Sequence, residues 1–139
     1  MTTLNWRLIF LLSLFGLAMA FATVWAIPSK FEPIFWLAIF AICADRIARR
    51  APGKLFLHGL LVGVVNSVWI TSVHLLFAGA YLATHADEAG MLEHGPLPGS
   101  PRLMMSVTGP VIGIVSGIVL GLLAMLASKL VKKATPPPA

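Results

Sequence analysis

Three long apolar segments dominate the pattern of hydrophobic and polar positions along the chain. Residues 8–27 hold no charge and no proline, residues 55–86 hold no Asp, Glu, Lys or Arg, and residues 103–128 hold no charge. At a rise of about 1.5 Å per residue, about 20 helical residues cross a hydrocarbon core of roughly 30 Å. Each segment is therefore predicted to be a membrane-spanning helix. The middle one is expected over about 55–83, with a tilt or a projection into water.

A shorter apolar stretch lies between the first two of these segments. It begins at Pro33, a residue suited to a first helical turn, and stays uncharged only to Ala44, too short to span alone. Asp45 and Arg49 are four residues apart and can pair on one helix face, and arginine stems can snorkel to the interface. We therefore predict a span over 33–50. A re-entrant segment that enters and leaves on one side is the alternative.

The predicted fold class is all-α, a single membrane domain over residues 1–139 with four transmembrane helices and both termini in the cytoplasm. Eight of the ten Lys and Arg residues lie on one side of this bundle: Arg7, Arg46, Arg49, Arg50, Lys54, Lys129, Lys132 and Lys133. The positive-inside rule places the loop 46–54 and the tail 129–139 in the cytoplasm, and the loop 85–102 outside. The predicted location is a bacterial-type inner (plasma) membrane, crossed several times.

The segment 8–27 has an alternative interpretation as a cleaved secretory signal. Arg7 supplies a basic start, and Ala18-Met19-Ala20 resembles a cleavage site. The apolar run is longer than the roughly 7–15 residues of a signal core, so we favour a retained helix. Cleavage would leave three spans in the same orientation.

Composition agrees with a membrane protein and removes several functional classes. Charged residues make up 11% of the chain, against about 25% in a typical soluble domain. The net charge of +5 is spread over the ends of apolar segments, where lipid headgroups account for it, so we predict a lipid partner and no nucleic acid. Cys43 is the only cysteine and excludes an intramolecular disulfide or a CxxC redox pair.

Small residues form a stripe along the last predicted helix. The stripe consists of Gly109, Gly113, Gly117 and Gly121, and a GxxxG pair, Gly59 and Gly63, lies on the 55–83 helix. Lipid tails give helices little hydrophobic drive to associate, so close van der Waals contact between small residues supplies it. This glycine-zipper pattern predicts a tight helix–helix seam. Its partner is either the 55–83 helix or another subunit.

Polar residues share one narrow face of the 55–83 helix with that GxxxG pair. At about 100° per residue, Asn66, His74 and Tyr81 fall within the same arc. If this face meets the glycine stripe, Asn66 and His74 are expected to donate hydrogen bonds to backbone carbonyls of the last helix. The functional alternative treats the three residues as a site, because intramembrane ionisable groups usually serve a function and histidine changes charge near neutral pH.

Metal or haem binding is a weaker alternative. His58 and His74 are about 24 Å apart along one helix and cannot share a metal ion. The loop residues His85, Asp87, Glu88, Glu93 and His94 could hold a cation, but their spacing matches no metal-site signature and a solvated loop explains them. We predict no metal site and no cofactor.

The sequence favours a non-enzymatic protein of unknown process, because templates such as GxSxG, the Walker loop and HExxH are absent. Its predicted role is helix association, as a homo-oligomer or as a subunit of a larger membrane complex. The first alternative is a channel or carrier for a small solute or proton that uses Asn66, His74 and Tyr81. The second is a His-dependent metal or haem protein.

Overall fold

The computed structural model describes residues 3–131, and every regular element in that range is a helix. The elements are α1 (Trp6–Trp25), the short 3₁₀ helix η1 (Ser29–Phe31), α2 (Glu32–Arg50), α3 (Leu55–Leu76), α4 (Ala78–Thr84), α5 (Ala86–Glu93) and α6 (Pro101–Leu130). The predicted all-α class is confirmed. Lys132, Lys133 and the predicted end of the tail lie outside the described residues.

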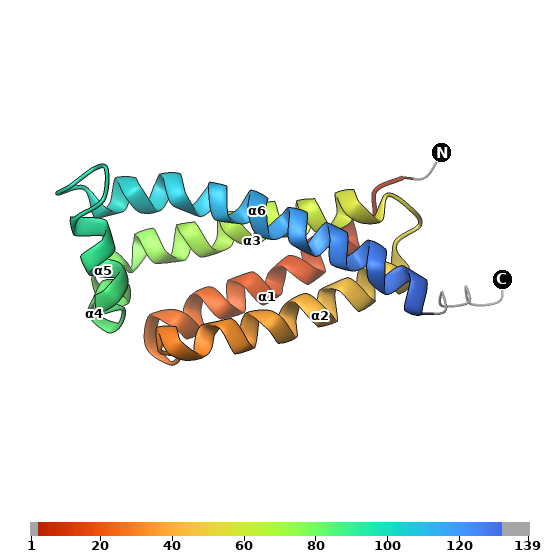
Figure 1. Ribbon diagram of the computed structural model, residues 1–139, viewed down its shortest axis with the longest axis horizontal. Coiled ribbons are helices and arrows are strands. Elements are labelled where there is room, and N and C mark those ends of the chain that lie inside the picture. Colours follow the sequence, from red (N-terminus) through yellow and green to blue (C-terminus); the bar gives the residue numbers. More distant parts are fainter. Residues whose placement is uncertain (1–2, 132–139) are drawn as a thin grey trace.

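Four long helices form the body of the molecule (Figure 1). Helix α3 packs against both α6 and α1, and α2 packs mainly against α6. The turn between α1 and α2 lies at the same end of the bundle as α4 and α5, and we call this the Pro28 end (Figure 1). The connection between α2 and α3 lies at the opposite end, which we call the Lys54 end.

Three of the described helices, α1, α3 and α6, are long and apolar enough to cross a membrane. Large apolar side chains on the outside of the bundle agree with this, among them Phe10, Leu37, Val68 and Leu122, each at least half exposed. A soluble protein rarely exposes apolar surface on this scale, whereas acyl chains cover it without cost. The chain is therefore a membrane protein.

Helix α2 is continuous over 19 residues, and it carries the predicted ion pair. The Arg49 Nε–H donates to Asp45 Oδ1 over 2.7 Å. On its other face α2 buries Cys43 and Ile47 in an apolar core that includes Ile9 of α1 and Leu120 of α6. This core lies toward the Lys54 end, where the helices are held together by close apolar contact.

The predicted helix over 55–83 is wrong over its last quarter, because α3 ends at Leu76 and a separate helix, α4, follows. At Phe77 the backbone leaves helical geometry, with φ −110° and ψ 31°. The Phe77 ring packs edge-on against Trp25, with 4.9 Å between ring centroids. A straight continuation would carry α4 away from α1, whereas the bend brings it onto the end of α1, where Thr84 Oγ1 lies 3.4 Å from the Val24 carbonyl oxygen.

Candidate ligand-binding cavity

All six predicted packing glycines lie in one seam between α3 and α6. The two helices are antiparallel, and small residues face each other in four successive pairs: Gly59 with Gly121, Gly63 with Gly117, Ser67 with Gly113 and Thr71 with Gly109. A Cβ atom added to Gly59 would lie 2.5 Å from the Cα of Gly121. One added to Gly117 would lie 2.6 Å from the Leu60 carbonyl oxygen. The backbones therefore approach too closely for any side chain.

This seam lies within one chain. The glycine stripe is accounted for by contact with α3, so it supplies no argument for a second subunit. Ser67 and Thr71, which the sequence reading did not include, complete the seam. The signal for them is their spacing, since they continue the four-residue step of Gly59 and Gly63.

The predicted hydrogen bonds from Asn66 and His74 to α6 do not form. His74 Nε2 instead lies 3.0 Å from Thr23 Oγ1 on α1, and the Asn66 side chain lies against Gly16, also on α1. The reason is the geometry of an α-helix, in which a row of residues spaced four apart is inclined to the helix axis. Such a row gradually turns around the helix along its length. The seam follows that row onto Ser67, so Asn66 and His74 are left on the neighbouring side.

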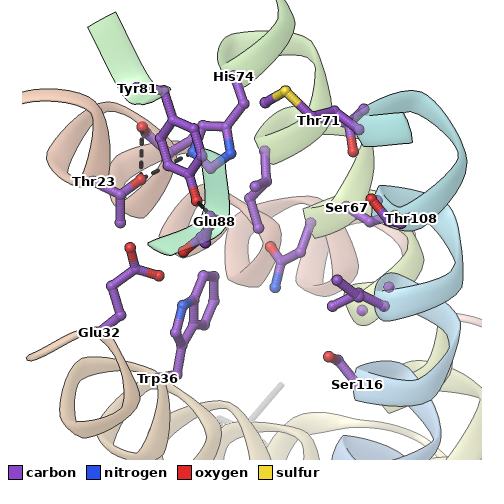
Figure 2. A pocket seen from close by; sticks show the side chains of 18 of the residues that line it. Thr23, Glu32, Trp36, Ser67, Thr71, His74, Tyr81, Glu88, Thr108 and Ser116 are labelled. Atoms are coloured by element: carbon purple, nitrogen blue, oxygen red, sulfur yellow. Dashed lines mark hydrogen bonds between the residues drawn. The ribbon is translucent and has the colours of Figure 1, made fainter. Parts of the chain in front are cut away.

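Beside the seam lies a cavity of about 610 Å³, and Gly63, Ser67 and Gly113 of the seam contribute to its wall. It lies between α1, α2, α3 and α6, and α5 covers it at the Pro28 end. The three predicted polar residues, Asn66, His74 and Tyr81, all line it. Trp36 and Ser116 lie on opposite sides of its lower part in Figure 2. The volume is that of a small-molecule site, for which about 300–1,000 Å³ is usual.

Polar groups gather at one end of the cavity, where α1, α3, α4 and α5 meet (Figure 2). The Thr23 hydroxyl donates to the Ala20 carbonyl over 3.1 Å and therefore accepts from His74 Nε2. The His74 ring stacks on Tyr81 with 4.0 Å between centroids, and the Tyr81 hydroxyl donates to Glu88. Burial raises the pKa of Tyr81, so the phenol keeps its proton and remains a donor.

His85 extends this network to α2. Its ring is 1% exposed and stacks on the other face of Tyr81, with 4.1 Å between centroids. Its Nε2 lies 2.8 Å from Glu32 Oε1, and its Nδ1 lies 3.0 Å from the Tyr81 carbonyl oxygen. Burial raises the pKa of the Glu32 carboxyl, although the hydrogen bond with His85 acts in the opposite direction.

His58 is a structural residue at the Lys54 end. It is fully buried, its Nδ1–H donates to the Lys54 carbonyl over 3.0 Å, and its Nε2 accepts from the Asn5 backbone N–H over 3.0 Å. Asn5 in turn accepts at its side chain from the Leu8 N–H and caps α1. A neutral imidazole satisfies both partners, so His58 ties α3 to the start of α1.

Two oxygens beside the cavity lack a partner. Among the described residues, Asn66 Oδ1 and Thr71 Oγ1 are the buried side-chain N or O atoms without a hydrogen bond. Both side chains line the cavity, and Asn66 is only 5% exposed. Buried polar atoms in proteins are nearly always paired, and an orphan costs roughly 1–3 kcal/mol. Both oxygens are packed against glycine backbones at the edge of the cavity, Asn66 Oδ1 against Gly16 and Thr71 Oγ1 against Gly109.

The external loop residues, which the sequence does not favour as a cation site, come together only in part. His85 and Glu88 come together with Glu32 of α2, and ligand atoms of the three lie within 4.8 Å of one another. Asp87, Glu93 and His94 do not join them in the described part of the chain. The sequence reading missed Glu32 because nothing in the local pattern links it to His85, 53 positions away.

A pH dependence of stability follows from the raised pKa of Glu32. A folded-state pKa above the ordinary 4.5 means that the folded protein binds this proton more tightly than the unfolded chain does. This contribution to stability is fully present below pH 4.5 and is lost as the pH rises through the folded-state value. Thermal unfolding should therefore show that Glu32→Gln loses less stability than the parent protein as the pH rises above 4.5. A chelator in both samples keeps stray metal ions away from the carboxylates. An unchanged pH profile would contradict the assignment.

Comparison with protein-family models, curated proteins and solved structures found no match.

Proposed function

We propose that this chain is a multi-pass membrane protein that binds an uncharged amphipathic small molecule, one with a hydroxyl donor and an apolar body. The observation that carries the proposal is the cavity itself, in which mainly apolar walls are combined with a few polar side chains, among them Asn66, Thr71 and Ser116. Ligand sites in proteins commonly combine an apolar lining with a few polar groups that orient the ligand. This develops the prediction of a solute site at Asn66, His74 and Tyr81.

The charge of the lining favours an uncharged ligand. No lysine or arginine is among the described residues that line the cavity, and its two carboxylates, Glu32 and Glu88, are already bonded to His85 and Tyr81. A charged head group would lose its hydration without a free counter-charge, which is costly at low dielectric. A hydroxyl needs only one polar partner, and Asn66, Thr71 and Ser116 are polar residues of the lining that can supply one.

The position of the cavity favours entry from the bilayer. Helices α2 and α6 both contribute to its wall, through Trp36 and Phe40 on one side and Ile112 and Ser116 on the other. Ile112 is 63% exposed, so the cavity wall continues onto the outer face of α6. An amphipathic molecule dissolved in lipid could enter between α2 and α6 without crossing water.

The topology that we propose has α1, α2, α3 and α6 as spans, with α2 crossing from Pro33. Most of the Lys and Arg residues that the structure describes lie at the Lys54 end, and the positive-inside rule then assigns that end to the cytoplasm of a bacterial-type cell. The cavity accordingly lies in the outer half of the membrane, and α4 and α5 cover it from the outside. Because the glycine seam is internal to the chain, it no longer favours an association subunit over a binding protein.

Quenching of Trp36 fluorescence tests the proposal. Protein in lipid nanodiscs, with Trp6, Trp25 and Trp69 replaced by phenylalanine, is titrated with 11-bromoundecanol and with its methyl ether, which lacks the donor. Bromine quenches tryptophan on contact, so the alcohol should quench Trp36 saturably and at least several-fold more efficiently than the ether.

The matched control retains only Trp25, which is 57% exposed and lies outside the cavity. The alcohol and the ether should quench Trp25 alike, in proportion to their concentration in the lipid. If both probes quench Trp36 equally and without saturation, the proposed site does not exist.

A further inference from the structure

We propose that Glu32, His85 and Glu88 form a binding site for a divalent transition metal ion, with zinc as the best match. The site lies at the Pro28 end, where the first residue of α2 meets the junction of α4 and α5. The hydrogen-bond donors and acceptors around His85 indicate this site independently of the proposed hydroxyl ligand.

The first step concerns the Nδ1 atom of His85. It lies 3.0 Å from the Tyr81 carbonyl oxygen, and a carbonyl can only accept. Thr84 Oγ1, at 2.9 Å from the same nitrogen, donates its own hydrogen to that carbonyl. The Nδ1 atom must therefore carry a hydrogen.

The second step concerns the opposite ring nitrogen. In a neutral imidazole with Nδ1–H, the Nε2 atom presents a lone pair, and it lies 2.8 Å from Glu32 Oε1. An ionised carboxylate also presents only lone pairs there. Two acceptors at this distance repel each other unless a positive charge lies between them. A proton on either group meets the need, and so does a metal ion bound by both.

Glu88 is the reason for preferring the metal. It follows His85 by three residues, so the two side chains fall on one face at the start of α5, and ligand atoms of all three residues lie within 4.8 Å. A single proton between His85 and Glu32 leaves the Glu88 carboxylate with the Tyr81 hydroxyl as its partner but no positive charge beside it, whereas a divalent ion uses both carboxylates and the imidazole and balances their charge. With zinc–ligand distances of about 2.0–2.2 Å in tetrahedral geometry, a bound ion would move His85 Nε2 and Glu32 Oε1 slightly farther apart than 2.8 Å and draw Glu88 closer.

The surroundings of the three ligands match those of metal sites. A metal-bound histidine usually donates its other N–H to a carbonyl or carboxylate, as His85 does to Tyr81. Ligating carboxylates are themselves held by hydrogen bonds, as Glu88 is by the Tyr81 hydroxyl. His58 provides the contrast, because its two partners are one acceptor and one donor and require no cation.

The chemistry of the ligands selects the metal. One nitrogen and two carboxylate ligands, with a remaining position for water, resemble the three-ligand zinc sites of proteins. Calcium and magnesium prefer oxygen ligands alone, so the imidazole disfavours them. An ion here would also join α2 to α4 and α5, which otherwise meet through few contacts at this end of the bundle.

Metal binding by untagged, EDTA-stripped protein in nanodiscs tests the proposal. Elemental analysis after equilibration with ZnCl₂ and gel filtration should give one zinc per chain, and Co²⁺ should give the visible absorption of a low-coordinate site. Competition with a chromogenic chelator should show that Glu88→Gln binds zinc at least about tenfold more weakly than the parent protein does. A loss of this size is usual when residues of a metal site are replaced. Glu88 is partly exposed, so this variant should fold.

Asp87→Asn and His94→Ala are the matched controls, because both residues belong to the same region but not to the three-residue cluster. They should bind zinc as the parent protein does. Zinc at no more than the background level would overturn the proposal, as would equal affinity in the parent protein and Glu88→Gln. A loss in His94→Ala larger than that in Glu88→Gln would overturn it as well.

Discussion

Replacing Gly63 with alanine is expected to lower the free energy of unfolding by about 1–3 kcal/mol, the usual cost of forcing extra atoms into a packed interior. The new Cβ would lie 2.5 Å from the backbone nitrogen of Gly117 and 2.8 Å from the Gly113 carbonyl oxygen. Backbone atoms cannot move aside as a side chain can, so α3 and α6 must separate along the seam. The gain in helix propensity from alanine, up to about 1 kcal/mol, offsets only part of this cost.

Gly79→Ala is the matched control for that experiment. Gly79 lies in α4 with no atom within 4 Å of an added Cβ, so the same chemical change meets open space. Alanine there should leave stability unchanged or raise it by up to about 1 kcal/mol. Reversible unfolding of both variants in mixed micelles provides the measurement. If Gly63→Ala proves no less stable than Gly79→Ala, the close seam is not a feature of the folded protein.

The second large effect is expected at Asn66, where stability and binding should change in opposite directions. Leucine has nearly the shape of asparagine, but it carries no polar atom to leave unpaired. Asn66→Leu should therefore stabilise the ligand-free protein by about 1–3 kcal/mol, the cost attributed to an unsatisfied buried group. The same variant should lose the preference of the cavity for 11-bromoundecanol over its methyl ether.

Two measurements on one variant make this prediction specific. A residue that serves only packing would not show higher stability together with lost selectivity. Ser67→Ala is a suitable comparison, since Ser67 also lines the cavity but its hydroxyl is bonded to the Val64 carbonyl over 2.8 Å. It should keep the alcohol preference. Unfolding of Asn66→Leu at lower denaturant than the parent, with selectivity intact, would argue against a ligand site at this position.

Much of the fold could be predicted from local patterns in the sequence. The uncharged runs predicted the long helices because hydrocarbon requires both apolar side chains and internally bonded backbone groups. The four-residue spacing of Gly113 and Gly117 predicted a close seam, and the spacing of Asp45 and Arg49 predicted their ion pair. In each case the physical cause acts between residues at most a few positions apart, so the pattern of the chain contains it.

The end of α3 could not be predicted in this way. Residues 77–83 continue the apolar, uncharged pattern, and no proline interrupts them. The helix ends because Phe77 packs against Trp25 and because Thr84 reaches the end of α1. These partners lie more than 50 positions away in the sequence. The competition between a straight and a bent path is decided by contacts that exist only after α1 and α3 have packed.

By itself, then, the sequence determined the solvent of this protein and the class of its elements, because hydropathy and periodicity are properties of each segment alone. Only the tertiary structure decided which neighbour each polar face meets. The inclined row of small residues rotated Asn66 and His74 toward α1, and the fold brought Glu32 to His85. A helix can present a polar group on several sides at similar local cost, so its partner is chosen by packing of the whole bundle.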